Sequence, residues 1–245
     1  MSRDPGARQG HAVLDLPSRN FKAMKIARLL GVTPDGPRKR MLEVGCGSGG
    51  ISHWFGACGL MDWKVEAVDV EDVRLATEGF GFRIVSGTTL PFESGSFDVV
   101  ISNHVIEHVG NDAAQREHLQ ELRRVLRRDG VVYLAAPSRW MLVEPHFRLP
   151  FLSWLPVPMS NAYVRIARKG WLYDCRPLTC RKLERMLREV GFEWHQHTAD
   201  ALRLTFELER PQAPFYRYVL SRLPARVYYA LRRVFPTLIY TLTAR

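Results

Sequence analysis

The segment EVGCGSGG at residues 43–50 constrains the fold of this chain more than any other feature. It follows a short apolar run that predicts a strand, and it precedes a run that predicts a helix. Glycines at such a junction permit a tight turn and let a ligand lie against bare backbone. Gly45, Gly47 and Gly50 also satisfy the dinucleotide pattern G-x-G-x-x-G, so a nicotinamide enzyme is one candidate. The segment therefore predicts a strand-turn-helix unit that binds a nucleotide cofactor.

Two carboxylates distinguish the candidate cofactors. Glu43 stands just before the first glycine, where a carboxylate disfavours a pyrophosphate dianion, whereas S-adenosylmethionine presents an ammonium and a sulfonium. Asp69 ends the predicted strand 65–70, about twenty residues beyond the glycines, where a carboxylate accepts hydrogen bonds from both ribose hydroxyls. Both cofactors carry that ribose. Glu43 therefore favours S-adenosylmethionine, while Asp69 supports an adenosine-containing cofactor of either kind.

Short apolar strands alternate with helical stretches from residue 40 onward. We predict strands at 40–44, 65–70, 83–86, 97–102 and 131–136, another from about residue 192, and a final edge strand at 237–244. This alternation is typical of a mostly parallel sheet with helices on both faces. The sequence therefore predicts a single α/β domain over residues 1–245, with a Rossmann-like seven-stranded sheet.

Capping residues mark the expected helix ends. Ser18 is the expected N-cap of a helix over 18–30 that Gly31 ends. Asp112 is the expected N-cap of a second helix, with Gln115 as its capping-box partner and the Asp-Gly pair at 129–130 as its stop. A third helix is expected over 179–190, ending at a glycine.

The predicted domain divides into a core and two insertions. Residues 18–137 form the cofactor-binding core, 138–178 a substrate lid, and 179–245 a C-terminal half with a helical insertion at 211–235. The lid is rich in aromatic residues and proline, which suits a stiff apolar cover, although extra core packed on the sheet explains the same residues. Tyrosine and arginine alternate over 215–235, which indicates either contact with an anionic membrane surface or an amphipathic helix packed on the domain.

Charge and cysteine content limit the cellular setting. The net charge of +10 suits nucleic acid, an anionic membrane surface or a phosphorylated substrate, and does not choose among them. No apolar run approaches the roughly 20 residues that span a bilayer, and the N-terminus lacks the apolar stretch of a secretory signal. The four cysteines have no C-x-x-C spacing. We therefore expect free thiols and a cytoplasmic protein, with peripheral contact to the inner membrane face as an option.

Three further segments carry a resemblance to a known family. GTTLPF at 87–92, SFDVVIS at 96–102 and RVLRRDGVV at 124–132 resemble, in order and spacing, the corresponding stretches of the class I small-molecule methyltransferases. The resemblance covers residues 40–137 and implies S-adenosylmethionine as cofactor, with the methionine part near Glu43 and the glycines, the ribose at Asp69 and the adenine at 86–88. The full set of residues implied for cofactor binding is Glu43, Gly45, Cys46, Gly47, Gly49, Asp69, Val70, Ser86, Gly87, Thr88 and Asn103. This chain departs from the family at Ser86, where an acidic residue is common.

Histidines after the fourth and fifth predicted strands are the candidate catalytic residues. Methyl transfer from a sulfonium needs alignment and exclusion of water but no protein nucleophile, while a hydroxyl acceptor benefits from a general base. His104, Glu107 and His108 are spaced to share one helical turn, and His146 follows the next strand. We predict that His108, or else His104 or His146, removes the proton. The alternative is that Glu107-His108 is only helix-capping structure.

A second resemblance supports a metal as an alternative to the base. Certain RNA-end and ubiquinone-pathway O-methyltransferases have an E-x-x-E-H metal site, and the stretch 104–108 is similar to it, with His104 in place of the first glutamate. His146 would then be a fourth ligand. Histidine and carboxylate ligands suit a divalent transition metal. The primary interpretation has no metal.

The expected acceptor is a hydroxyl on an amphipathic molecule. The stretch 102–105 (SNHV) lacks the N/D-P-P-Y/F/W signature with which the amino-methylating branch of the family clamps an exocyclic amine. A sugar, a quinone precursor or a phenol, free or lipid-linked, is therefore favoured. The rivals are an RNA 2'-hydroxyl, which charge favours although no RNA module is recognisable, and a cofactor-binding scaffold without turnover.

Overall fold

A computed structural model describes residues 15–33, 36–57, 63–209 and 235–245, together with residues 214, 218, 222, 224 and 227. Across these residues the chain forms a seven-stranded sheet of order β3-β2-β1-β4-β5-β9-β8. Strands β1 to β5 are parallel to one another in the sheet, and β9 is antiparallel to both β5 and β8. The strands are β1 Arg40–Val44, β2 Lys64–Asp69, β3 Phe80–Ile84, β4 Phe97–Asn103, β5 Leu126–Pro137, β8 Phe192–Gln196 and β9 Thr237–Ala244. The prediction of a seven-stranded, mostly parallel sheet is confirmed.

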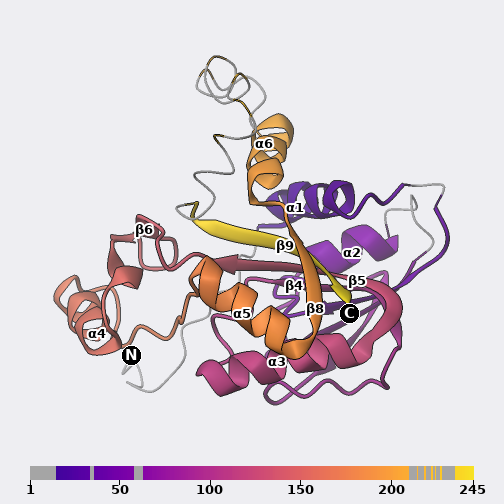
Figure 1. Ribbon diagram of the computed structural model, residues 1–245, viewed down its shortest axis with the longest axis horizontal. Coiled ribbons are helices and arrows are strands. Elements are labelled where there is room, and N and C mark those ends of the chain that lie inside the picture. Colours follow the sequence, from indigo (N-terminus) through magenta and orange to yellow (C-terminus); the bar gives the residue numbers. More distant parts are fainter. Residues whose placement is uncertain are drawn as a thin grey trace.

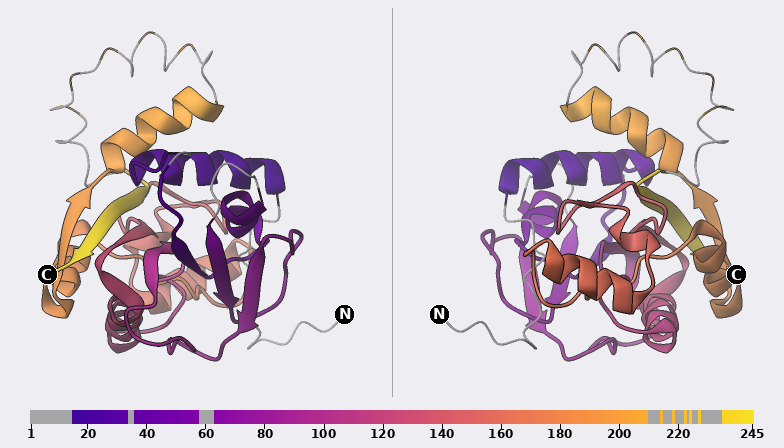
Figure 2. Two further views of the ribbon diagram at one scale, coloured as in Figure 1. Left: turned by 90° about the vertical axis from the view of Figure 1, so that its right-hand side faces the viewer. Right: turned by 90° about the vertical axis from the view of Figure 1, so that its left-hand side faces the viewer.

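Helices cover both faces of this sheet, as predicted (Figure 1). On one face lie α1 (Leu16–Leu29), α2 (Gly50–Ala57) and α6 (Thr198–Glu209), and on the other lie α3 (Asp112–Val125) and α5 (Cys180–Val190). Figure 2 shows the same three layers edge-on. Each face has its own core: Ile26, Ile51 and Phe55 pack on one side, and Leu119 and Leu183 on the other.

The lid is a small unit of its own beside the sheet. It contains the short strands β6 (Val143–Glu144) and β7 (Leu149–Pro150), the 3-10 helix η1 (Leu152–Trp154) and helix α4 (Val157–Ile166). A bridge between Ser138 and Leu178 brings its two ends together. Its separate core consists of Phe147, Leu149, Leu152, Val164, Tyr173 and Cys175. The lid therefore begins and ends at one point, just beyond the carboxyl end of β5.

The prediction that 237–244 forms an edge strand is wrong. Strand β9 pairs with β5 on one side and β8 on the other, so β8 is the edge. Leu238, Tyr240 and Leu242 of β9 face one core, and Ile239 faces the other. The alternation of residue types was visible in the sequence, but it does not reveal which strands lie on either side.

Two predicted N-caps are displaced. Helix α1 begins at Leu16, and the Ser18 hydroxyl donates to the Asp15 carbonyl. Asn111, not Asp112, caps α3, because its side-chain oxygen accepts from the amides of Ala113 and Ala114. Both Asn and Asp serve as N-caps, so adjacent candidates compete.

One predicted capping contact and two element boundaries also differ from the prediction. Gln115 donates to the carbonyls of Ile106 and Arg176 and takes no part in a capping box. Helix α3 ends at Val125, and β5 begins at Leu126 and runs through the Asp-Gly pair that was expected to stop the helix. Strand β3 occupies 80–84 rather than 83–86. Pairing with β4 extends β5 toward its N-terminus, with an irregular register between Phe97 and Val99.

Two sequence expectations concern residues with no described placement. Cys46, Cys175 and Cys180 are free thiols, as expected, while Cys58 lies outside the described residues. Most of the insertion at 211–235, including the Tyr- and Arg-rich stretch, also lies outside them. Within the described part of the chain, no helix has the length and apolar character to span a membrane.

Candidate active site

A cavity of about 930 Å³ lies at the carboxyl ends of the parallel strands. Open α/β sheets bind ligands at this edge, where the order of strands reverses. Here the reversal lies between β1 and β4. The cavity is lined by the loop after β1, the end of β2, the segment after β3, the turn after β4 and residues of the lid. One continuous space therefore joins the glycine loop to the lid.

The glycine loop after β1 has the backbone that its sequence requires. Gly45, Gly47 and Gly49 all have positive φ, at 74°, 51° and 76°, a region that side chains strongly disfavour. A Cβ on Gly45 would also overlap the side chain of Val105. The Gly45 amide donates to the Val68 carbonyl, which ties the loop to β2. Gly45 and Gly47 line the cavity, whereas Gly49 packs beneath it against the backbone at Ala76.

Glu43 is a buried carboxyl group at the floor of the cavity. Only 1% of it is exposed, and its Oε2 accepts a hydrogen bond of 2.5 Å from the Ser52 hydroxyl. Burial raises its pKa to about 8, although the Ser52 hydrogen bond and the charge of Arg19 oppose that rise. A buried carboxyl group of this kind is a good partner for a cation. Arg19, from α1, also lines the cavity.

Asp69 joins the end of β2 to the glycine loop. Its Oδ2 accepts from the Gly47 amide and its Oδ1 from the Val70 amide, both at 2.7 Å. These bonds hold the carboxylate against the loop, where it faces the cavity. Beyond β3, Gly87 and Thr88 line the same wall, whereas Ser86 is exposed and does not border the cavity.

The cavity thus brings together most of the residues singled out in the sequence. Those that line it are Glu43, Gly45, Cys46, Gly47, Asp69, Val70, Gly87, Thr88, Asn103, His104, His108 and His146. Sequence reasoning missed others, among them Arg19 and Lys22 from α1 and Tyr173, Asp174 and Arg176 from the end of the lid. These residues are distant along the chain from every motif. No local pattern marked them.

The turn after β4 arranges two histidines around one buried carboxylate. His104 has a positive φ of 60°, and the following residues form a hydrogen-bonded turn rather than a helix, with the His108 amide donating to the Val105 carbonyl. The Glu107 Oε1 lies 3.3 Å from His104 Nδ1 and 3.8 Å from His108 Nε2. The expected helical turn is therefore absent, although His104, Glu107 and His108 do lie close together.

Glu107 is almost completely buried, with 1% of its surface exposed. Burial by itself would raise the pKa of Glu107, but the neighbouring imidazoles of His104 and His108 outweigh it and lower the pKa below its ordinary value. Among the described residues, neither carboxylate oxygen has a hydrogen bond of good geometry. Glu107 is therefore a buried carboxylate that favours its ionised form and has two imidazoles as neighbours.

His118 borders the cavity but is held as a neutral, structural residue. It is 2% exposed, and its Nε2 lies 3.0 Å from the Ser102 hydroxyl. Burial lowers its pKa to about 4. At neutral pH it carries no charge.

The comparison with known families agrees with this geometry. Residues 42–134, from β1 to β5, match the family model described as a methyltransferase domain. The matched stretch holds the glycine loop, Asp69 and the turn after β4. These residues form a methyltransferase domain of the class I, S-adenosylmethionine-dependent type. The glycine loop and Asp69 thus lie in a methyltransferase domain, and the nicotinamide alternative is set aside.

Known relatives match this chain at low sequence identity and over only part of its length. An uncharacterised protein of Methanocaldococcus jannaschii is 25% identical over 64% of this chain and 66% of its own length. A ubiquinone biosynthesis O-methyltransferase of Parvibaculum lavamentivorans is 27% identical over 48% of this chain and 49% of its own length. A ribosomal RNA small subunit methyltransferase C of Alcanivorax borkumensis is 26% identical over 51% of this chain and 38% of its own length. The matched part thus spans between 38% and 66% of the length of these relatives.

Solved structures share the methyltransferase fold at low sequence identity. One is a chain of the complex between the Haloferax volcanii Trm112 methyltransferase activator and a methyltransferase, with a TM-score of 0.56 and 16% identity over 94% of this chain and 93% of that one. Another is a TehB-like S-adenosylmethionine-dependent methyltransferase of Corynebacterium glutamicum. Its TM-score is 0.51, and it is 15% identical over 92% of this chain and 88% of its own. At these identities the likeness establishes the fold alone.

Proposed function

We propose that this chain is an O-methyltransferase that methylates a hydroxyl group of an amphipathic acceptor held beneath the lid. One observation carries the proposal: His104, backed by the buried Glu107 carboxylate, lines the same cavity as the glycine loop and Asp69. A histidine oriented by a buried carboxylate is a suitable base for a hydroxyl proton.

The cavity residues fit S-adenosylmethionine along its length. Glu43 would hold the ammonium, Asp69 the ribose hydroxyls, and Gly87 with Thr88 the adenine. Asn103 offers a buried side-chain oxygen that has no hydrogen-bond partner among the described residues. When bound, the cofactor supplies an electrophilic methyl group on a sulfonium. The task of the protein is then to align the acceptor oxygen and exclude water.

His104 is better placed than His108 to serve as the base. Its Nδ1 faces Glu107 at 3.3 Å, which leaves Nε2 to accept the acceptor's proton. His108 lies further from Glu107, and its Nδ1 faces the Cys175 thiol at 3.7 Å. The sequence pointed to His108 first because spacing alone does not show which nitrogen of each ring is engaged.

The lid end of the cavity supports an acceptor with an apolar body. Met141, Val143, Pro145 and Tyr173 line it, and such a wall suits a quinone precursor, a phenol or a lipid-linked sugar. The similarity to a ubiquinone biosynthesis O-methyltransferase supports the same class. The rival is an RNA hydroxyl, which the ribosomal RNA relative and the charge of +10 favour.

A substrate screen with methyl-labelled cofactor tests this proposal. The purified chain would be incubated with phenols, quinone precursors, lipid-linked sugars and RNA, and labelled products identified by mass spectrometry. We expect label in an ether of one of the first three classes. Label in RNA alone would instead establish the rival, and label in no acceptor would favour a scaffold without turnover.

The raised pKa of Glu43 predicts that cofactor binding releases a proton. With a pKa of about 8, Glu43 is mostly protonated at pH 7, and a bound ammonium would favour its ionised form. The free protein therefore holds a proton that the complex has lost, so affinity rises with pH. We expect an increase of up to about tenfold between about pH 6 and about pH 7, where the cofactor's own amino group stays protonated.

Calorimetry in buffers of different ionisation enthalpy measures this proton directly. Glu43→Gln should remove the proton release and the rise in affinity with pH. Asp72→Ala serves as the matched control, because Asp72 is an exposed carboxylate paired with Arg74. Binding by the unmodified protein without proton release would refute the proposed role of Glu43.

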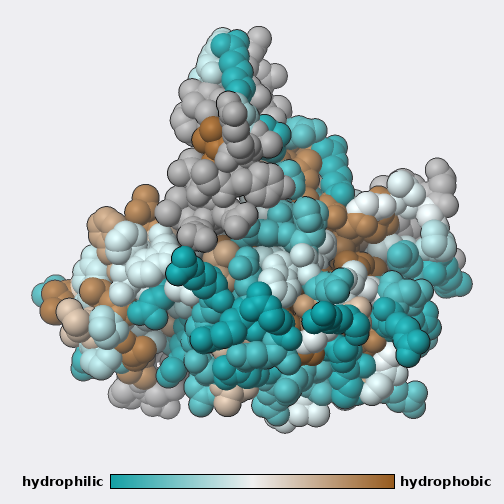
Figure 3. All heavy atoms as spheres, viewed as in Figure 1, coloured by the Kyte–Doolittle hydropathy of each residue, from teal (hydrophilic) through white to brown (hydrophobic). Residues whose placement is uncertain are grey.

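We also propose that the lid faces an anionic membrane from which a lipid-linked acceptor enters. Hydrophobic residues gather at the left of Figure 3, where the lid lies. The exposed apolar side chains of the lid include Trp140, Leu142, Phe151, Trp154, Met159, Ile166 and Trp171. Arg148, Arg165, Arg168 and Lys169 are exposed on the same unit. Apolar contact and attraction of cations to acidic headgroups act together, at about 1 kcal/mol for each cation near the surface.

Sedimentation with vesicles tests the membrane contact. The chain should associate with acidic vesicles and dissociate as salt is raised. Ile166→Asp, at a position 81% exposed, should weaken the association, whereas Leu75→Asp, at a position 56% exposed outside the lid, should not. If acidic vesicles at low salt bind no protein, the membrane contact is refuted.

A further inference from the structure

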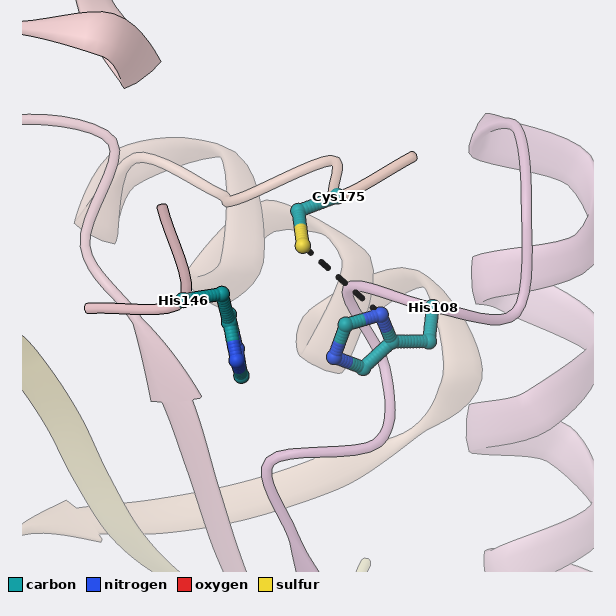
Figure 4. A group of neighbouring side chains, drawn as sticks. All are labelled: His108, His146 and Cys175. Atoms are coloured by element: carbon teal, nitrogen blue, oxygen red, sulfur yellow. Dashed lines mark hydrogen bonds between the residues drawn. The ribbon is translucent and has the colours of Figure 1, made fainter. Parts of the chain in front are cut away.

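Three side chains from distant parts of the chain converge beside the cavity. His108 comes from the turn after β4, His146 from the loop between β6 and β7, and Cys175 from the last segment of the lid. The donor atoms of all three lie within 4.8 Å of one another. Figure 4 shows the two imidazoles and the thiol directed toward a common space. The three residues lie in three separate segments of the chain, and no two of them belong to the same helix or strand.

The spacing matches the coordination sphere of zinc. Tetrahedral zinc, with bonds of about 2.3 Å to sulfur and about 2.0 to 2.1 Å to nitrogen, separates a sulfur from a nitrogen ligand by about 3.6 Å. The Cys175 Sγ lies 3.7 Å from His108 Nδ1. The rings of His108 and His146 are 5.5 Å apart between centroids and steeply inclined, at 71°, so they do not stack. The exposed His146 has its donor atom within 4.8 Å of those of the other two residues.

The types of donor select among metals. A thiolate with two imidazoles suits zinc or a similar transition ion and does not suit magnesium or calcium, which prefer oxygen. The set also differs from the E-x-x-E-H arrangement that resembles residues 104–108. His104 and Glu107 lie outside it, and Cys175 takes part, although no sequence motif marked this cysteine.

A buried carboxylate supports His108 from behind. The Nδ1 of His108 faces Cys175, while its Nε2 faces Glu107 at 3.8 Å. Histidines that bind metals usually direct their second ring nitrogen toward a carboxylate or carbonyl, which fixes the tautomer. Glu107 is 1% exposed, and its oxygens have no hydrogen bond of good geometry among the described residues. This carboxylate is therefore placed to support a metal-bound His108 as well as His104.

We propose that His108, His146 and Cys175 bind a zinc ion that fastens the lid to the core of the domain. His108 belongs to the core, whereas His146 and Cys175 belong to the lid, so the ion connects the two units beside the cavity. Three protein ligands leave one of the four positions of zinc for water or another ligand. His108 and His146 both line the cavity, so that position is accessible from it. This proposal does not depend on which acceptor is methylated.

Metal binding by the full chain tests the site without any assay of turnover. The metal-free protein would be titrated with Zn²⁺ against a chromophoric chelator, and with Co²⁺ to record its absorption spectrum. We expect one tightly bound ion and a cobalt spectrum with both tetrahedral and thiolate-to-metal bands. Cys175→Ser should remove the thiolate band, and His146→Ala should weaken Zn²⁺ binding by roughly 100-fold or more.

Matched controls separate this site from other donors. Cys180→Ser and His53→Ala change a buried cysteine and a histidine outside the cluster, and both should keep the metal. His195→Ala tests the second group of possible ligands, His195, His197 and Asp200, which lies at the end of β8. The proposal is overturned if the unmodified chain binds no ion or if its cobalt complex has no thiolate band. It is also overturned if binding survives Cys175→Ser but is lost in His195→Ala.

Discussion

His104→Ala is expected to lower kcat by about 10²- to 10⁴-fold, the range of a general base. The alanine variant keeps the cavity and the cofactor-binding loop but has no group to accept the hydroxyl proton. Because the Nδ1 of His104 faces Glu107, the loss should appear in kcat with little change in cofactor affinity. Single-turnover kinetics with labelled cofactor and the acceptor found by the screen measures it.

The histidine variants also distinguish the proposed general base from the proposed metal ligands. His104→Ala should leave zinc content unchanged, since His104 lies outside the His108, His146 and Cys175 cluster. His53→Ala is the matched control for turnover, because His53 lies on α2 and bonds the Glu78 carbonyl outside the cavity. If His104→Ala turns over at the unmodified rate, His104 is not the base.

Asp69→Ala is expected to weaken S-adenosylmethionine binding by about 1 to 3 kcal/mol, or roughly 5- to 150-fold in Kd. Two effects contribute to this loss. The ribose hydroxyls lose their proposed acceptor, and the amides of Gly47 and Val70 lose the carboxylate that holds the loop. Calorimetry with S-adenosylmethionine and with its demethylated product measures the change.

A nearby carboxylate provides the control for Asp69. Asp72→Ala removes an exposed acid that pairs with Arg74, within the same segment, and should leave Kd unchanged. Asp69→Asn separates the two contributions, because an amide oxygen still accepts one loop amide while the negative charge is lost. Equal affinity in Asp69→Ala and the unmodified chain would show that Asp69 does not contact the cofactor.

Local chemistry explains why the glycine-loop end of the cavity was predictable. A tight turn at the end of a strand requires residues that tolerate positive φ, so glycines at 45, 47 and 49 mark it in the sequence. Glu43 lies near the end of β1 and Asp69 ends β2, and neighbouring parallel strands end at one edge of a sheet. Order along the chain therefore implied their closeness in space.

Element boundaries and neighbours were less predictable, for two different reasons. Asn111 and Asp112 are both good N-caps, so composition does not decide between them. The edge position of β8 depends on pairing across the sheet, because β9 returns antiparallel between β5 and β8. Periodicity reports the two faces of a strand but not the strands on its sides.

The sequence by itself determined the fold class, the cofactor and the histidines that follow the fourth strand, because each depends on residues close together in the chain. Only the tertiary structure decided how the lid meets the core. The Ser138–Leu178 bridge closes the insertion and brings Cys175 within 3.7 Å of His108, although the two residues are far apart in the sequence. Contacts of this kind arise from packing between units, which no local pattern of residues encodes.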